Sequence, residues 1–277
     1  GLGAGEEEFA KPEQAREYKR VNRGMSLEQF RGIFWLEYIH RLWGRLIGIV
    51  FAVPMIWFLL KRRVPEGLAP HLWFLLFLGG AQGVVGWLMV QSGLVDRPSV
   101  SQYRLALHLG LAVAIYGYIL WLALGLLQRR TLPPRPPSGV ARLFVFYVFF
   151  VILSGAFVAG LDAGLVHNTF PDMSGSLFPP GGFDPNLGWL NMFENQTVVQ
   201  FQHRWLAKLV VVFAFLLWLR VRIAHRRGWS SRRAADLVLV MALLQLGLGI
   251  STLLLGVPTA IATLHQAGAL LLFTLAI

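Results

Sequence analysis

Four histidines repeat in a pattern that can bring two metal-binding side chains together in each half of the chain. They are His40 and His108 in the first half and His203 and His265 in the second. A glutamine beside glycines lies within each pair (Gln82 and Gln245), and the spacings from the first histidine are equal, 82 − 40 = 42 and 245 − 203 = 42. The onward spacings, 108 − 82 = 26 and 265 − 245 = 20, differ because the loop at 92–103 is longer. Matched spacing through successive apolar segments indicates an internal duplication.

Paired imidazoles at similar depth on two helices can face each other across a planar macrocycle, and such pairs suit haem iron. A histidine that caps a helix or satisfies a hydrogen bond is the simpler explanation of any single one, but it does not explain four in register. Zinc is a second alternative, although a zinc site closes four ligands on one centre. Because the repeat supplies two separate pairs, we expect all four histidines to ligate haem iron.

Glu37 breaks the symmetry of the repeat. It lies three residues before His40, so both side chains point to one face of a helix. The matching position in the second half is the neutral Gln200. A carboxylate inside a bilayer costs about 2.5–3.5 kcal/mol at the centre and less near the interface. The asymmetry predicts chemistry in the first half and electron handling in the second; an interfacial ion pair of Glu37 with Arg41 or Arg104 is the alternative.

Three arginines accompany the histidines. Arg41 and Arg204 each directly follow the first histidine of a pair, and Arg104 lies four residues before the second histidine of the first pair. Each can hold a haem propionate by charge-assisted hydrogen bonds, and anchoring at the membrane interface is an equally good explanation. Gln82 and Gln245, with their glycines, are expected to serve close helix packing and hydrogen bonding.

The composition predicts that lipid surrounds the elements that carry these residues. The 277 residues are 56% hydrophobic and 14% charged, whereas about a quarter of a soluble domain is charged. The net charge of +11 does not indicate nucleic-acid binding, because the arginines cluster in short loops between apolar runs, as the positive-inside rule describes. The absence of cysteine excludes disulfides, thiolate metal sites and iron–sulfur clusters.

Apolar runs of about 20 residues predict helices that cross a bilayer. Seven are predicted, at 35–60, 71–91, 104–127, 141–161, 201–219, 235–256 and 260–277. The fold class is therefore all-α, a polytopic transmembrane protein with two pseudo-symmetric four-helix bundles. The helix that would match the fourth span in the first half is expected to precede Gly1, and further residues are expected after Ile277.

The charges of the loops predict which side of the membrane each loop faces, and the chain then divides into four parts. Alternating spans place the arginine-bearing loops at 61–70, 128–141 and 220–234 on one side, which the rule assigns to the cytoplasm or matrix. The loop at 162–200, which has four acidic residues and no lysine or arginine, falls on the other. The predicted parts are an outer extramembrane segment at 1–30, an N-terminal half at 31–127, a proline-rich cytoplasmic linker at 128–140 and a C-terminal half at 141–277.

Several segments together resemble haem A synthase. They are residues 37–45, 100–104, 154–164, 193–195 with 200–204, and 264–268. The likeness covers nearly the whole chain. The cysteine-free outer loops and residues 22–26 are similar to the proteobacterial and mitochondrial branch of that family.

The resemblance implies eight spans in two four-helix halves and a membrane-bound, haem-dependent oxidoreductase. The implied reaction oxidises the C8 methyl of haem O to a formyl group, which gives haem A for terminal oxidases. By motif match, His203 and His265 would ligate a resident haem b, and His40 and His108 would bracket the substrate haem. Glu37 would be essential beside the substrate, either stabilising positive charge or accepting a proton; the sequence leaves both roles open.

Two other classes were weighed against this one. A di-haem b-type membrane electron-transfer protein explains the histidines but not the Glu37/Gln200 asymmetry, and a repeat-built transporter would need polar groups at mid-depth that are scarce here. The expected location is the bacterial inner membrane, or the mitochondrial inner membrane in a eukaryote. Expected partners are haem O, membrane lipid, a haem O synthase and a quinone or other electron acceptor. The acceptor, the source of the formyl oxygen and the oligomeric state are left open, an oligomer included.

Overall fold

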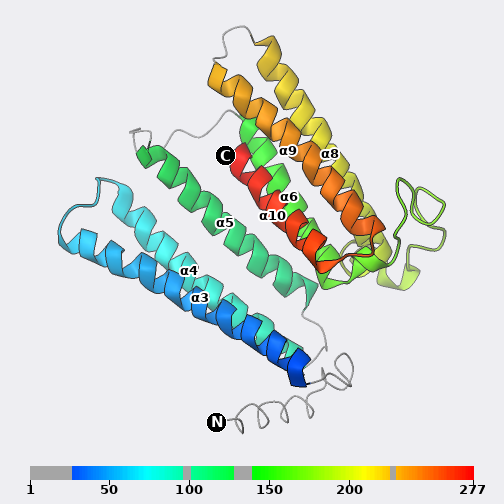
Figure 1. Ribbon diagram of the computed structural model, residues 1–277, viewed down its shortest axis with the longest axis horizontal. Helices are drawn as coiled ribbons and strands as arrows, with labels where there is room; N and C mark the ends of the chain where they lie inside the picture. The colour runs from blue at the N-terminus through cyan, green and yellow to red at the C-terminus, as the bar shows by residue number, and fades with distance from the viewer. Residues whose placement is uncertain (1–26, 96–100, 128–138, 225–228) are drawn as a thin grey trace. The chain divides into compact units, whose positions relative to one another are not determined.

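Long helices make up most of the structure, a computed structural model that describes residues 27–95, 101–127, 139–224 and 229–277 (Figure 1). The long helices are α3 (Leu27–Leu60), α4 (Leu68–Val95), α5 (Gln102–Leu127), α6 (Gly139–Gly160), α8 (Gln196–Ile223), α9 (Trp229–Leu254) and α10 (Thr259–Ala276). Between α6 and α8 the chain forms the short helices η1 (Ala163–Leu165), η2 (Pro185–Leu190) and α7 (Asn191–Glu194). The described residues contain no strand, which confirms the predicted all-α class.

Each of the seven predicted spans coincides with a long helix. Six of these helices, α3, α4, α5, α6, α9 and α10, are long and apolar enough to cross a membrane. The chain is therefore a multi-pass membrane protein. Helix α8 is not among the six; it carries four basic side chains along its 28 residues, and its crossing stays a prediction.

Three helices begin at least five residues before the predicted spans, and one of them is α9, which begins at Trp229 instead of residue 235. Helix α3 begins at Leu27, inside the segment predicted to be extramembrane, and α8 begins at Gln196 instead of residue 201. Their first turns are polar, so a window of hydropathy misses them. The start of α8 is fixed by Asn195, whose Oδ1 accepts hydrogen bonds from Thr197 N (2.9 Å) and Val198 N (3.2 Å), the usual role of an asparagine N-cap.

The C-terminal helices form a closed bundle. Helix α8 packs against α6 and α9, and α10 packs against α9 and α6, so each of the four touches two others (Figure 1). On α6 the buried side chains Phe144, Val148 and Val151 follow the helical period. Phe144 meets Phe213 of α8 edge to face at 5.5 Å. This arrangement agrees with the four-helix bundle predicted for the second half.

The chain divides into two compact units, Gly1–Leu111 and Ala112–Ile277, whose boundary falls inside α5. The first unit contains the antiparallel hairpin of α3 and α4, together with the first turns of α5 (Figure 1). The predicted boundaries at residues 127 and 141 stay predictions. Residues 1–26 of the predicted outer segment and nearly all of the predicted linker, 128–138, lie outside the described residues.

Candidate functional site

The second histidine pair lies inside the C-terminal bundle. His203 comes from the second turn of α8 and His265 from the second turn of α10. Their ring centroids are 6.5 Å apart and their planes are inclined at 87°. The structure thus brings together two side chains that are 62 residues apart in sequence, as the repeat predicts.

Hydrogen bonds occupy the Nδ1 atom of both rings in this pair. His203 Nδ1 lies 2.7 Å from Ser154 Oγ of α6, and His265 Nδ1 lies 3.0 Å from Gln245 Nε2 of α9. Gln245 Nε2 also donates to the carbonyl of His265 at 2.7 Å, while its Oε1 is buried without a partner. Because the carbonyl only accepts, Gln245 Nε2 is the atom that lies between it and Nδ1, and Gln245 can donate to both. At His203 the contact with Ser154 leaves Nε2 for a metal.

The first histidine pair has the same separation. His40 of α3 and His108 of α5 have ring centroids 6.5 Å apart and planes inclined at 70°. Gln82 of α4 donates to the carbonyl of His108 at 3.0 Å, and its Nε2 lies 3.4 Å from His108 Nε2. His108 Nδ1 and Gln82 Oε1 are buried without a partner. The glutamine of each half therefore braces the second histidine, but it meets a different ring nitrogen.

A glycine one turn after each glutamine leaves room for the ring of the same histidine. A Cβ built on Gly86 would lie 3.0 Å from His108 Cε1, and one on Gly249 would lie 2.9 Å from His265 Cε1. The distance at Gly249 is shorter than real Cβ contacts and the one at Gly86 is tighter than most of them, so a larger residue at either position would push the histidine ring. The glutamine–glycine spacing is four residues in both halves, 86 − 82 and 249 − 245, and residues four apart share one helix face.

Both pairs fit a metal that already has ligands in a plane. Metal–imidazole bonds of roughly 2.0–2.1 Å, with a centroid-to-nitrogen distance of ~1.1 Å, put the centroids of two opposed imidazoles roughly 6.3 Å apart. The measured 6.5 Å in each pair is close to this value. Among the described residues no group of three or more His, Asp or Glu side chains gathers. Two protein ligands suit a metal held in a porphyrin, whereas zinc requires three or four.

Glu37 and its counterpart Gln200 have different surroundings. Glu37 lies on an exposed stretch of α3 and forms an ion pair with Arg41, one turn later on the same helix. Gln200 is only 2% exposed and donates to the carbonyl of His167 at 3.0 Å. The alternative in which Glu37 pairs with Arg41 therefore exists in the structure. The Glu37 carboxylate in this ion pair remains partly exposed.

The arginines that were predicted to hold propionates have protein partners. Arg104 donates to the carbonyl of Leu88 on α4 at 2.7 Å. Arg204 donates to three carbonyls of the loop between α6 and α8, those of His167, Thr169 and Asp172. We interpret Arg204 as an anchor of this loop, a role that residue types alone do not reveal because its acceptors are backbone atoms.

His167 is the centre of that anchored loop. Its Nδ1 lies 2.8 Å from Ser174 Oγ, and its Nε2 lies 3.2 Å from Thr197 Oγ1 at the start of α8. Burial, and then the charge of Arg204, lower the pKa of His167 below its usual value. A neutral imidazole can accept a hydrogen bond that the protonated ring cannot, so the neutral form suits this position. These contacts give His167 a structural role in the loop.

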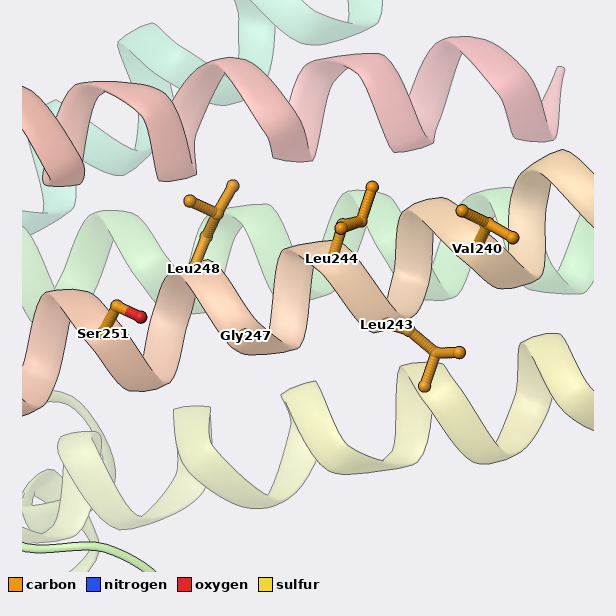
Figure 2. A pocket seen from close by; sticks show the side chains of 6 residues that line it. All are labelled: Val240, Leu243, Leu244, Gly247, Leu248 and Ser251. Atoms are coloured by element: carbon orange, nitrogen blue, oxygen red, sulfur yellow. The ribbon is translucent and has the colours of Figure 1, made fainter.

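Helix α9 has a second, unrelated face. Figure 2 shows the residues that line an open apolar groove there, Val240, Leu243, Leu244, Gly247, Leu248 and Ser251. A Cβ on Gly247 would meet nothing within 4 Å. At 100° per residue this glycine points away from Gln245 and Gly249, which face His265. The groove is thus separate from the histidine pair.

Comparison with known proteins agrees with the paired histidines. A family model described as cytochrome oxidase assembly protein matches residues 4–277. The haem A synthase of Nitrosospira multiformis is 49% identical, over 98% of this chain and 78% of that protein. Those of Paramagnetospirillum magneticum and Nitrosomonas eutropha are 46% and 45% identical, over 96% and 95% of this chain and 76% of each relative. The chain belongs to the haem A synthase family.

Membership of the haem A synthase family confirms the resemblance predicted from the sequence motifs. Within this fold, the structure pairs all four predicted histidines and places Glu37 on the helix of His40. Sequence reasoning missed the roles of Ser154 and Gly155 beside His203, and it assigned the glycines near Gln82 and Gln245 to helix packing without their contacts to the histidine rings. The glycines could have been found, because each follows its glutamine by four residues in both halves.

Proposed function

We propose that the chain is a haem A synthase, an oxidoreductase that converts the C8 methyl of haem O to a formyl group. The observation that carries the proposal is the presence of two histidine pairs with equal ring separation, of which only the first has a carboxylate on the same helix face. A simple two-haem electron carrier would not need that difference. Relatives named haem A synthase that align over nearly the whole chain support the same function.

The second pair is the proposed site of a resident haem b. When bound there, haem b supplies electron transfer. His203 and His265 would hold it, and Ser154 and Gln245, which lie at the Nδ1 atoms, orient the two rings. The packing of α6, α8, α9 and α10 around the pair helps to fix the ring positions. Such a site suits a cofactor that stays bound.

The first pair is the proposed site of the substrate haem. His40 and His108 bracket it, and Glu37 lies one turn before His40 on the same face of α3. As a carboxylate, Glu37 either accepts a proton from the reacting region or stabilises positive charge that develops there. Its carboxylate forms an ion pair with Arg41, one turn later on α3.

Location and partners form part of the proposal. The basic residues Lys61, Arg62 and Arg63 between α3 and α4 would face the cytoplasm of a bacterial inner membrane. The four histidines would then lie towards the outer side, because each follows the N-terminal end of its helix. A haem O synthase would supply the substrate, and a quinone or another acceptor would take the electrons.

Extraction of bound haem tests the function directly. The protein is produced together with a haem O synthase, purified in detergent, and its haems are extracted and identified by mass. We expect haem b together with haem O or haem A, and production of haem A that depends on this chain. A strain that produces the haem O synthase alone is the control.

The di-haem alternative gives a different result. If the purified protein holds only haem b, two per chain, although haem O is supplied, the chain is an electron carrier and the proposal is wrong. A His40→Ala/His108→Ala double variant separates the two cases further. It should keep one haem b per chain if the pairs have the proposed roles.

A further inference from the structure

Ser154 of α6 contacts the ring of His203. Its Oγ lies 2.7 Å from His203 Nδ1 and also 2.7 Å from the carbonyl oxygen of Val151, one turn earlier on the same helix. A serine hydroxyl has one proton to donate. The carbonyl can only accept, so the proton of Ser154 goes to Val151, a common bond for serine in a helix. Towards His203, Oγ must then act as an acceptor.

This bond fixes the tautomer of His203. If Oγ accepts, the ring proton is on Nδ1 and the lone pair of the neutral imidazole is on Nε2. A metal-ligating histidine usually donates its other ring N–H to an acceptor, which sets the ring orientation and raises the basicity of the ligand. Among the described residues, no hydrogen bond to Nε2 of His203 competes for that lone pair.

Gly155, the next residue of α6, allows the contact to form. A Cβ at this position would lie 3.3 Å from His203 Cε1, closer than most real Cβ contacts. The two helices are also joined below the ring by Tyr147, whose hydroxyl donates to the carbonyl of Leu206 at 3.0 Å. The serine and the glycine together place one ring of the pair before any ligand arrives.

We infer that Ser154 is a positioning residue that holds His203 in its Nδ1-protonated form and thereby sets the affinity and the reduction potential of the haem b iron. The inference rests on the proposed haem b site at His203 and His265. An acceptor on Nδ1 makes the imidazole a stronger electron donor to iron, which favours the oxidised state and lowers the potential.

The test compares three variants of the full-length protein in detergent. Ser154→Ala removes the acceptor, Ser154→Thr restores a hydroxyl, and Tyr147→Phe removes a hydrogen bond between α6 and α8 without touching the histidine. The readouts are haem b per chain, the dissociation rate of haem b to an apo-protein acceptor, and the midpoint potential from an optical redox titration. None of them depends on the production of haem A.

Ser154→Ala should release haem b about 10- to 100-fold faster and shift the midpoint potential upwards. Ser154→Thr should return both values towards the wild type, and Tyr147→Phe should leave the potential unchanged.

If Ser154→Ala keeps the potential and the release rate of the wild type, or if Tyr147→Phe shifts the potential equally, the inference is wrong. Should Ser154→Ala not fold, Ser154→Cys, a weaker acceptor of similar size, must show the same upward shift or the inference is likewise wrong. Wild-type protein that contains no haem b would instead contradict the proposed function.

Discussion

His203 and His265 lie within four mutually packed helices, whereas His40 and His108 come from α3 and α5, with α4 as the other described helix that contacts the pair. The separation of the rings is 6.5 Å in both places. Both pairs share what we call the brace: a glutamine that hydrogen-bonds the second histidine, and a glycine four residues later that leaves room for its ring. What differs is the support of the first histidine, which Ser154 bonds in one pair and no described residue bonds in the other.

The two pairs therefore have the same ring separation but different contacts around the rings. The brace acts on the second histidine of each pair, and the ring separation is the same in both. Ring orientation is set by the neighbours that contact each ring. In the second pair Ser154 and Gln245 both reach an Nδ1 atom, whereas in the first pair Gln82 reaches Nε2 of His108. The described contacts of the two pairs differ in this way.

The largest expected effect comes from removal of a ligand. His265→Ala should lower the haem b content by more than about tenfold and abolish haem A formation, since both a ligand and its brace are lost. His108→Ala should abolish haem A formation but keep haem b. Pyridine haemochrome spectra and haem extraction measure both quantities, with His71→Ala as a control. Equal loss of haem b in the two variants would remove the distinction between the pairs.

Glu37 provides the second test of the comparison. Glu37→Gln should lower haem A formation by about 100-fold or more, the usual contribution of a general base, while haem b content and its spectrum stay unchanged. Arg41→Gln is the matched control, because it breaks the same ion pair but keeps the carboxylate. If the two variants lose equal activity, Glu37 serves only as the partner of Arg41, and the chemical asymmetry of the halves disappears.

The helices and the pairing of the histidines could be predicted because both depend on properties that sequence carries directly. Apolar length predicts a helix that crosses lipid, and equal spacings in a repeat predict equal positions. The span predicted at 35–60 agrees with the apolar stretch Phe34–Leu60, whereas α8 begins five residues before the predicted 201, since a polar first turn does not register in hydropathy. Asn195 at the start of α8 was a readable capping signal.

The surroundings of the histidines could not be predicted to the same depth. Arg204 bonds to backbone carbonyls of a loop, and every residue has a carbonyl, so residue types do not indicate the contact. Ser154 meets His203 only because α6 is rotated to face α8, and that rotation is settled by packing over the whole bundle. The sequence shows the glycines near each glutamine, but it does not show that they lie against the rings of His108 and His265.

Glycine variants sharpen the comparison without touching a ligand. Gly249→Ala places a methyl group against His265 and should cost about 1–3 kcal/mol, or roughly five- to 150-fold in haem b affinity. Gly247→Ala, two residues away in the open groove of α9 (Figure 2), is the control and should have little effect. Haem b dissociation rates measure the difference.

The same pair of substitutions can be made in the first half. Gly86→Ala presses on His108 in the same way, whereas Gly83→Ala meets nothing within 4 Å. Gly86→Ala should raise the KM for haem O and leave haem b in place. A loss of haem b in Gly86→Ala would show that the braces do not act separately on the two pairs.

The smallest expected effect concerns the loop that Arg204 anchors. Burial and the charge of Arg204 lower the pKa of His167, so between its ordinary and its lowered pKa the anchored loop binds fewer protons than the released one. Stability of the anchored state must then fall as pH decreases through the ordinary value near 6.5.

Hydrogen exchange of residues 167–176, corrected for intrinsic rates, should rise a few-fold from pH 7.5 to pH 5.5. His167→Gln should remove this rise, and the histidine-free turn at 61–67 in the first unit should not show it. An equal rise in that turn would mean that acid loosens the whole protein, and the loop would then no longer distinguish the second half from the first.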